Sequence, residues 1–139
     1  MINKTLLKAS AAAYGVNLNN TALDRFDQYA ELLVEWNEKI NLTAITEPDE
    51  IVMKHFVDSL VVLSKVDLPK GASLLDIGTG AGFPGLALKI ARPDLNVTLL
   101  DSTEKKLKVV KEIAEKLGFT TDEQCPADEF GIPYYDMDK

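Results

Sequence analysis

Glycines and two acidic residues at fixed spacing are the strongest sign of chemistry in this sequence. The segment 76–85 reads DIGTGAGFPG. It contains the G-x-G-x-x-G spacing of a dinucleotide-binding turn plus one further glycine: Gly78, Gly80, Gly82 and Gly85. Such glycines let the backbone turn sharply and approach a ligand, while N–H groups at the start of the next helix favour an anionic or acceptor group. Asp101 follows about 20 residues later, where a carboxylate can accept both hydroxyls of a ribose.

The acidic residue before the glycines, Asp76, decides which cofactor fits this turn. A pyrophosphate would be repelled by a carboxylate at this point, because like charges in a partly desolvated pocket oppose each other. S-adenosylmethionine has no phosphate and presents an ammonium and a sulfonium, both of which Asp76 can stabilise. We therefore favour S-adenosylmethionine over NAD. The alternative is that the glycines serve only to pack a helix against a strand.

The predicted elements that position these residues are helices in the first part of the chain, followed by alternating strands and helices. Apolar residues at helical spacing predict helices from Leu6 to Gly15 and from Asn20 to Asn41, and a third from a capping box at Thr46 through Leu63. Short apolar runs predict buried parallel strands over 73–77 and 96–101, each followed by a helix (84–92 and 103–118). This order predicts an α/β fold: the opening half of a doubly wound parallel sheet behind a helical extension.

Composition limits what else the protein can be. The 139 residues carry a formal net charge of -7 and include one cysteine and one histidine, Cys125 and His55, which excludes an internal disulfide and a Cys- or His-based metal site. A reducing, cytoplasmic setting is expected, and no apolar run reaches the ~20 residues of a membrane span. Residues 120–139 hold six acids and one base, a net of -5, which leaves -2 for the rest. We therefore divide the chain into a helical extension (1–68), the first half of a cofactor-binding domain (69–119) and a divergent acidic tail (120–139).

A set of short motifs extends this interpretation to a family. The motifs are WN at 36–37, NLT at 41–43, HFVDSL at 55–60, the glycine turn with its preceding strand at 75–85, and LLDS at 99–102. Together they resemble the bacterial guanine-N7 methyltransferases of 16S ribosomal RNA, the glucose-inhibited division protein B family, from about residue 20 to residue 118.

The resemblance implies a class I S-adenosylmethionine-dependent methyltransferase, Rossmann-like, that acts in the cytoplasm on 16S rRNA or the small ribosomal subunit. By the same resemblance, cofactor contacts fall on Gly78 and Phe83 in the turn and on Asp101 at the strand end, and Ala127 and Asp128 take the place of an Ala-Glu adenine contact. The tail departs from the family, since Pro126 stands where arginine is usual and later strands are absent. The sequence thus resembles a truncated copy, inactive if it ends at residue 139; a complete protein is expected to be a monomer.

The implied reaction needs no general base. Guanine N7 has an in-plane lone pair and no proton, so methyl transfer needs positioning and water exclusion but no general base. No catalytic residue is therefore nominated. Basic groups that could contact RNA phosphates lie on one predicted helix (Lys105, Lys106, Lys108 and Lys111), although a solvated helix face explains them better.

Two further side chains have structural interpretations. We expect His55 to form a conformational pair with Asp58, and Trp36 to pack the helical extension onto the sheet. With only two central strands, we also expect a sheet edge without its usual neighbour and exposed apolar surface, hence a marginally stable domain. The functions that compete with the methyltransferase are an NAD-binding oxidoreductase fragment and a non-catalytic remnant.

Overall fold

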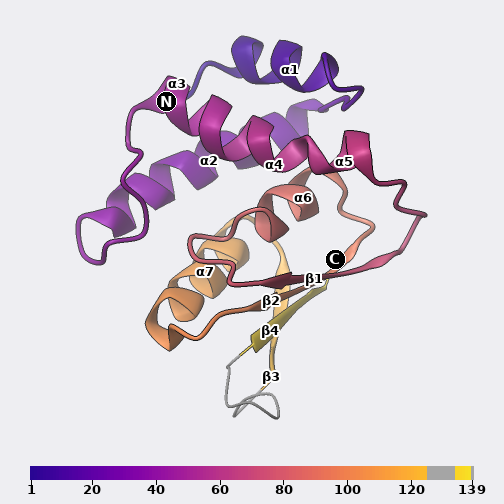
Figure 1. Cartoon of the computed structure of the whole chain (residues 1–139). Coiled ribbons are helices and arrows are strands. Elements are labelled where there is room, and N and C mark those ends of the chain that lie inside the picture. Colours follow the sequence, from indigo (N-terminus) through magenta and orange to yellow (C-terminus); the bar gives the residue numbers. More distant parts are fainter. Residues whose placement is uncertain (125–133, 139) are drawn as a thin grey trace.

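The computed structural model describes residues 1–124 and 134–138 and places its helices over one face of a four-stranded sheet (Figure 1). A π-helical segment, labelled η1, interrupts the third helical stretch. In chain order the elements are α1 (Lys4–Ala12), α2 (Asn20–Asn37), α3 (Pro48–Glu50), η1 (Ile51–Val57), α4 (Asp58–Leu60), α5 (Val62–Lys65), β1 (Ser73–Ile77), α6 (Gly85–Ala91), β2 (Asn96–Leu100), α7 (Glu104–Lys116), β3 (Thr120–Gln124) and β4 (Tyr134–Asp138).

Side-chain caps set the ends of the helical extension. The Asn19 side chain accepts a hydrogen bond from the Ala22 N–H at 2.8 Å and so starts α2. The helix ends at Asn37, four residues before the predicted Asn41, because the Asn37 side chain accepts from the N–H groups of Leu42 and Thr43 and folds the chain back.

The third helical stretch begins one residue later than predicted. Glu47, not Thr46, is the N-cap of α3, and its carboxylate accepts from the Glu50 N–H at 2.9 Å. From there the chain stays helical to Lys65 except at Val61, and the middle turns are π-helical. The expected single helix is therefore correct in extent but irregular in its hydrogen bonding.

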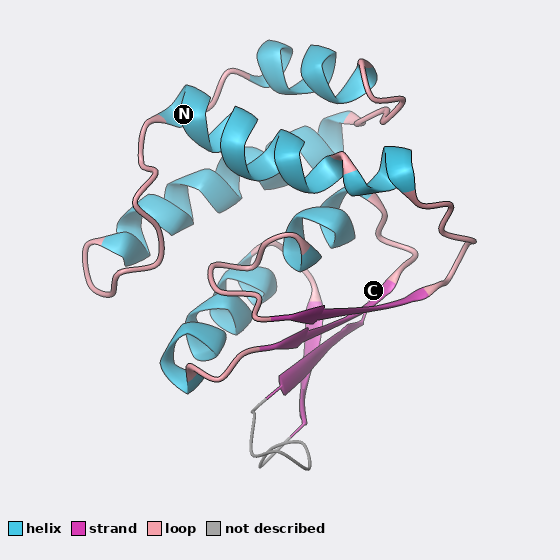
Figure 2. Cartoon of the chain, viewed as in Figure 1, coloured by secondary structure: helices cyan, strands magenta, loops and turns pink. Residues whose placement is uncertain are grey.

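The sheet combines parallel and antiparallel pairs in the order β1-β2-β4-β3 (Figure 2). The predicted α/β unit is confirmed: β1 and β2 are parallel, with Ser73 opposite Asn96 and Ile77 opposite Leu100. The antiparallel pairing of β4 with β2 and with β3 was not predicted. Strands β3 and β4 lie within the segment that we expected as an acidic tail, so the sheet is mixed and not purely parallel.

Strand β1 lies at an edge of this sheet and exposes apolar side chains, as predicted. Leu75 is 55% exposed and Ile77 69% exposed, whereas Asp76 between them is only 7% exposed. Side chains alternate along a strand, so Asp76 faces the helices and its neighbours face the uncovered side. The exposed pair follows from having helices on only one face of the described sheet.

The core lies between the helical extension and this sheet. Its largest fully buried side chains include Phe26 and Tyr29 of α2 and Phe56 of η1. The rings of Phe26 and Phe56 have centroids 4.8 Å apart, and Tyr29 lies 5.4 Å from Phe56. Full burial of one such side chain stabilises the fold by about 1.5–3 kcal/mol. The helical extension is thus joined to the rest of the chain by a continuous apolar interior.

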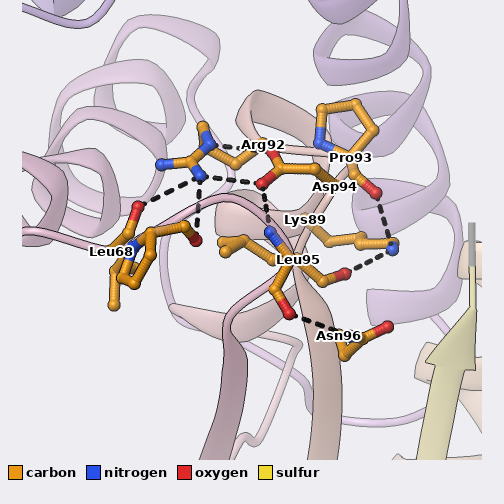
Figure 3. A network of polar contacts seen from close by, with 9 residues as sticks. Leu68, Lys89, Arg92, Pro93, Asp94, Leu95 and Asn96 are labelled. Atoms are coloured by element: carbon orange, nitrogen blue, oxygen red, sulfur yellow. Dashed lines mark hydrogen bonds and ion pairs between the residues drawn. The ribbon is translucent and has the colours of Figure 1, made fainter.

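A polar network fixes the amino ends of β1 and β2 (Figure 3). Arg92 donates from Nε and Nη2 to the Asp94 carboxylate at 2.8 Å each, and Asp94 also accepts from the Gly71 N–H at 3.0 Å. The buried Lys89 ammonium donates to the carbonyls of Pro93 and Leu95. Because ligands bind at the carboxyl ends of parallel strands, this network supports the sheet from the opposite end.

Candidate functional site

The glycine turn connects β1 to α6 and is held against the carboxyl end of β2. Gly78, Gly80 and Gly82 all have positive φ, at 75°, 56° and 102°. Other residues adopt this conformation only at a cost, which explains the three glycines. The Gly78 and Thr79 N–H groups donate to the carbonyl of Leu100 at 2.7 and 3.1 Å.

The fourth glycine has a different role. A Cβ on Gly85 would overlap the Leu99 side chain and lie 2.8 Å from an Asp76 carboxylate oxygen. Glycine here permits the close approach of α6 to the strands. The packing function that we considered for the glycines therefore applies at this position, whereas the conformation of the other three serves the turn itself.

Asp101 meets the turn from the end of β2. Its Oδ2 accepts a hydrogen bond from the Gly80 N–H at 2.7 Å, and its Oδ1 accepts from the Thr103 N–H at 2.8 Å. The side chain is 8% exposed. Each carboxylate oxygen has two acceptor sites, so both oxygens keep one site beyond these backbone contacts. The strand-end acid is thus adjacent to the turn, as its spacing in the sequence suggested.

Asp76 lies beneath the turn on the helix-facing side of β1. Its Oδ2 accepts from the Gly85 N–H at 2.9 Å. Burial raises the pKa of the Asp76 carboxyl, and the nearby charge of Asp101 adds to the rise, against opposing contributions from the Thr79 side chain and the Gly85 N–H. Asp76 therefore anchors the start of α6 as well as bringing negative charge to the turn.

Phe83, the remaining described residue of the predicted site, directs its ring into the helical extension. It stacks on His55 with centroids 4.3 Å apart and on Tyr29 with centroids 5.2 Å apart. Its backbone N–H donates to the Thr79 carbonyl at 3.0 Å. The ring is thus part of an aromatic cluster, which we define as Tyr29, His55, Phe56 and Phe83.

Tyr29 was missed by the sequence analysis. Its hydroxyl donates to the carbonyl of Ala81 in the turn at 2.6 Å, and the side chain is fully buried. Burial raises the pKa of the Tyr29 phenol well above its usual value, and the charge of Asp76 contributes. Tyr29 follows Phe26 by three residues, so helical periodicity could have placed it on the buried face of α2, although not against this carbonyl.

The predicted pairing of His55 with Asp58 is wrong. His55 Nε2 lies 2.8 Å from the Thr43 hydroxyl, in the loop that follows α2. Burial lowers the pKa of the His55 imidazole, while the charge of Asp58 acts in the opposite direction. The histidine therefore links that loop to the aromatic cluster.

The other predicted residues lie away from the turn or outside the residues that the structure describes. Ala127 and Asp128, our expected adenine contacts, are outside the described residues. On α7, Lys108 lies 3.5 Å from Glu104, an exposed pair typical of a solvated helix face. Trp36 is half-buried, and the Lys39 ammonium lies 5.0 Å from the centroid of its ring. Trp36 and Lys116 of α7 both line a surface hollow of about 240 Å³.

Within residues 1–124 and 134–138, no three His, Cys, Asp or Glu side chains are grouped so that they could hold a metal ion. In the same ranges, every helix is too short or too polar to cross a membrane.

Comparison with known proteins supplies the family context. A family model described as rRNA small subunit methyltransferase G matches residues 22–127. The ribosomal RNA small subunit methyltransferase G of Desulforamulus reducens is 50% identical over 114 residues, which cover 82% of this chain and 48% of that protein. The proteins of the same name from Acetivibrio thermocellus and Listeria monocytogenes are 46% and 44% identical, over 82% and 86% of this chain and 47% and 50% of theirs. The chain thus spans about half the length of these curated relatives.

Proposed function

Because the chain belongs to the rRNA small subunit methyltransferase G family, we propose that it binds S-adenosylmethionine at the glycine turn and forms the cofactor-binding part of an enzyme that methylates guanine N7 in 16S rRNA. The proposal includes S-adenosylmethionine as the methyl donor, guanine as the base and N7 as the methylated atom. It also assigns six residues to the cofactor site: Asp76, Gly78, Gly80, Gly82, Phe83 and Asp101. Because the proposed substrate is ribosomal RNA, we also propose that the enzyme acts in the cytoplasm.

The contact between Asp101 and Gly80 is the observation that carries the proposal. It brings the acid at the end of β2 within 2.7 Å of a backbone N–H in the turn after β1. A ribose bound there would use the remaining acceptor sites of the carboxylate. The positive-φ glycines next to it leave the backbone accessible, since a Cβ at Gly78 or Gly80 would meet no atom within 4 Å.

The charge of Asp76 favours a cationic cofactor over a dinucleotide. Its carboxylate is buried directly beneath the turn, where a pyrophosphate would meet a like charge with little solvent screening. The ammonium and sulfonium of S-adenosylmethionine would instead lower the cost of keeping Asp76 ionised. Cofactor binding should therefore lower the pKa of the Asp76 carboxyl, which burial raises in the free protein.

The chemistry requires orientation of the two reactants. Bound S-adenosylmethionine would supply a methyl group carried on a sulfonium, and the in-plane N7 lone pair of guanine would accept it. No proton moves, so the chain's own residues need only hold the donor and exclude water. Asp101 and the glycine turn would hold the donor. We further propose that residues 1–68 support this turn as a helical extension of the cofactor-binding domain at 69–119.

Calorimetric titration with S-adenosylhomocysteine tests the proposal. This compound is the product left when the donor loses its methyl group; it keeps the ribose, the ammonium and the carboxylate, so it should bind the wild-type protein. Preferential binding of NAD would support the competing oxidoreductase assignment. A folded protein that binds neither compound would support a non-catalytic remnant.

A further inference from the structure

The aromatic cluster joins the glycine turn to a part of the helical extension that lies far from it in sequence. Phe83 comes from the turn, His55 from η1 and Tyr29 from α2. The rings of His55 and Phe83 are within 4° of parallel at 4.3 Å, and those of Tyr29 and Phe83 within 13° at 5.2 Å. Any rotation of the His55 ring would therefore disturb the packing of Phe83 and the backbone that carries it.

The orientation of His55 is set by the loop that follows α2. Thr43 Oγ1 lies 2.8 Å from His55 Nε2 and also accepts from the Ile45 N–H at 3.0 Å. The Thr43 backbone is fixed in turn, since its N–H donates to the Asn37 side chain at 2.9 Å. A continuous series of contacts thus runs from the end of α2, through Thr43 and His55, to Phe83.

The contact with Thr43 bears on the tautomer of His55, because either group can be the donor in this hydrogen bond. If the Thr43 hydroxyl donates to Nε2, its oxygen still accepts from the Ile45 N–H. The imidazole is then neutral and carries its proton on Nδ1. This state agrees with the direction of its pKa, which burial lowers.

The π-helical geometry of η1 contributes to this placement. His55 lies within its seven residues, where the wider turns change the direction of side chains relative to an α-helix. The Ser59 hydroxyl donates to the His55 carbonyl at 2.6 Å, at the point where the chain returns to α-helix. Such π segments occur often at functional sites, although they are uncommon in helices at large.

We propose that Thr43 and His55 are positioning residues for the cofactor site: the hydroxyl of Thr43 orients the His55 ring, and the ring holds Phe83 and the glycine turn in the conformation that accepts the cofactor. The inference rests on the proposed function, because it assigns these residues to the same site. It makes cofactor affinity depend on a loop of the helical extension, through contacts that end at Phe83.

The test combines calorimetry with NMR of the single histidine, using S-adenosylhomocysteine as the ligand. We expect Thr43→Val, which removes the hydroxyl at nearly constant volume, to weaken binding about five- to tenfold, as loss of one hydrogen bond implies. Thr43→Ser should restore wild-type affinity. The matched control is Thr46→Val, at an exposed residue outside this series of contacts.

The histidine signals report the geometry directly, because the protein contains only His55. In the wild-type protein, ¹⁵N spectra should show the Nδ1–H tautomer, and the ring protons should be shifted upfield by stacking on Phe83. Both features should change in Thr43→Val and return in Thr43→Ser. Saturating S-adenosylhomocysteine should move the His55 signals of the wild-type protein, a readout that decides the matter even if Thr43→Val does not fold.

The outcomes separate this inference from the function on which it rests. Wild-type binding with unmoved His55 signals, or equal affinities of wild type and Thr43→Val, would overturn the positioning role and leave the cofactor assignment intact. Equal weakening by Thr43→Val and Thr43→Ser would also overturn it, because the hydroxyl would not be the cause. No binding to the folded wild-type protein would contradict the proposed function and the inference together.

Discussion

The hydroxyl of Tyr29 donates a 2.6 Å hydrogen bond to the carbonyl of Ala81, and this contact fastens the helical extension to the glycine turn. The two residues are 52 positions apart in the sequence. From the end of β2, the Asp101 carboxylate accepts from the Gly80 N–H. The turn is therefore held by groups from two elements outside the glycine motif, and its shape depends on the helical extension as well as on the sheet.

Replacing Tyr29 with phenylalanine should destabilise the protein and weaken cofactor binding. The change keeps the ring stacked on Phe83 but leaves the buried Ala81 carbonyl without its donor, which costs about 1–3 kcal/mol. Urea denaturation measures the loss. Tyr14→Phe is the matched control, because Tyr14 is 46% exposed, and it should have little effect. Equal stability of the two variants would show that the contact with Ala81 contributes nothing.

An alanine at Gly82 should be more harmful than one at Gly15. Both glycines have positive φ, at 102° and 78°, so both substitutions pay a conformational cost of about 1–2 kcal/mol. Only at Gly82 would the new Cβ also meet a side chain, 2.5 Å from the Tyr29 hydroxyl oxygen, whereas nothing lies within 4 Å at Gly15. We expect an additional loss of about 1–3 kcal/mol from this overlap.

Thermal unfolding of the two glycine variants checks this difference. The double variant Tyr29→Phe/Gly82→Ala provides a second control, because removal of the hydroxyl relieves part of the overlap. Its loss of stability should be smaller than the sum of the two single losses. Additive losses, or equal effects at Gly15 and Gly82, would contradict the close packing of Tyr29 on the turn.

Asp76→Asn should change how stability depends on pH. Burial raises the pKa of Asp76, so above the unfolded value of about 3.9 the folded state binds more protons at this site than the unfolded state. The contribution of this site is most favourable below the unfolded pKa and is lost as pH rises through the folded pKa. The asparagine can still accept from Gly85 but does not titrate.

Urea denaturation from pH 4 to pH 7 isolates this effect, because the other acids titrate alike in both proteins. The unfolding free energy of the wild type should fall relative to that of Asp76→Asn as pH rises. Affinity for S-adenosylmethionine should be lower in Asp76→Asn than in the wild type, since the variant lacks the negative charge that we propose faces the cationic donor. A stability difference that does not vary with pH would contradict the burial of an ionisable group at this position.

Asp94→Asn should show the reverse pH dependence. The Arg92 guanidinium and the Gly71 N–H hold the pKa of Asp94 well below its usual range. Its stabilising contribution is therefore present above the unfolded pKa of about 3.9 and declines as pH falls through and below that value. At pH 7 the variant should be less stable by about 1 kcal/mol, because the pair is partly exposed.

This position also provides a control for the site. Asp94 lies at the amino ends of the strands (Figure 3), so at pH 7 the folded variant should bind S-adenosylhomocysteine as tightly as the wild type. Weakened binding by Asp94→Asn would show that the two ends of the sheet are energetically coupled, contrary to this prediction.

The sequence was sufficient to predict features that depend on local patterns. The two parallel strands, the glycine turn and the arrival of Asp101 beside it followed from short apolar runs and from the fixed geometry of a strand–helix–strand unit. Helix starts were predicted to within a few residues, because Asn and Pro at these positions have clear local preferences.

Contacts between distant elements could not be predicted in this way. The bond from Tyr29 to Ala81 and the stack of His55 on Phe83 depend on how α2 and η1 pack on the sheet, and no spacing in the sequence encodes that packing. We predict a pair between His55 and Asp58 because the two are close in the sequence, whereas the hydrogen-bond partner of His55 is Thr43, in the loop that follows α2. The antiparallel β4 was missed because its sequence, YYDMD, lacks the apolar run of a buried strand.

Calorimetric titration of the wild-type protein and Asp101→Asn with S-adenosylhomocysteine is the most direct test of the proposed cofactor site. The amide removes the charge and turns one acceptor of the ribose hydroxyls into a donor, so we predict at least tenfold weaker binding, about 1.4 kcal/mol. Asp49→Asn, at an exposed position, should bind like the wild type, and NAD should give no heat with any of the three proteins. Undiminished binding by folded Asp101→Asn, or binding of NAD in preference to S-adenosylhomocysteine, would contradict the account.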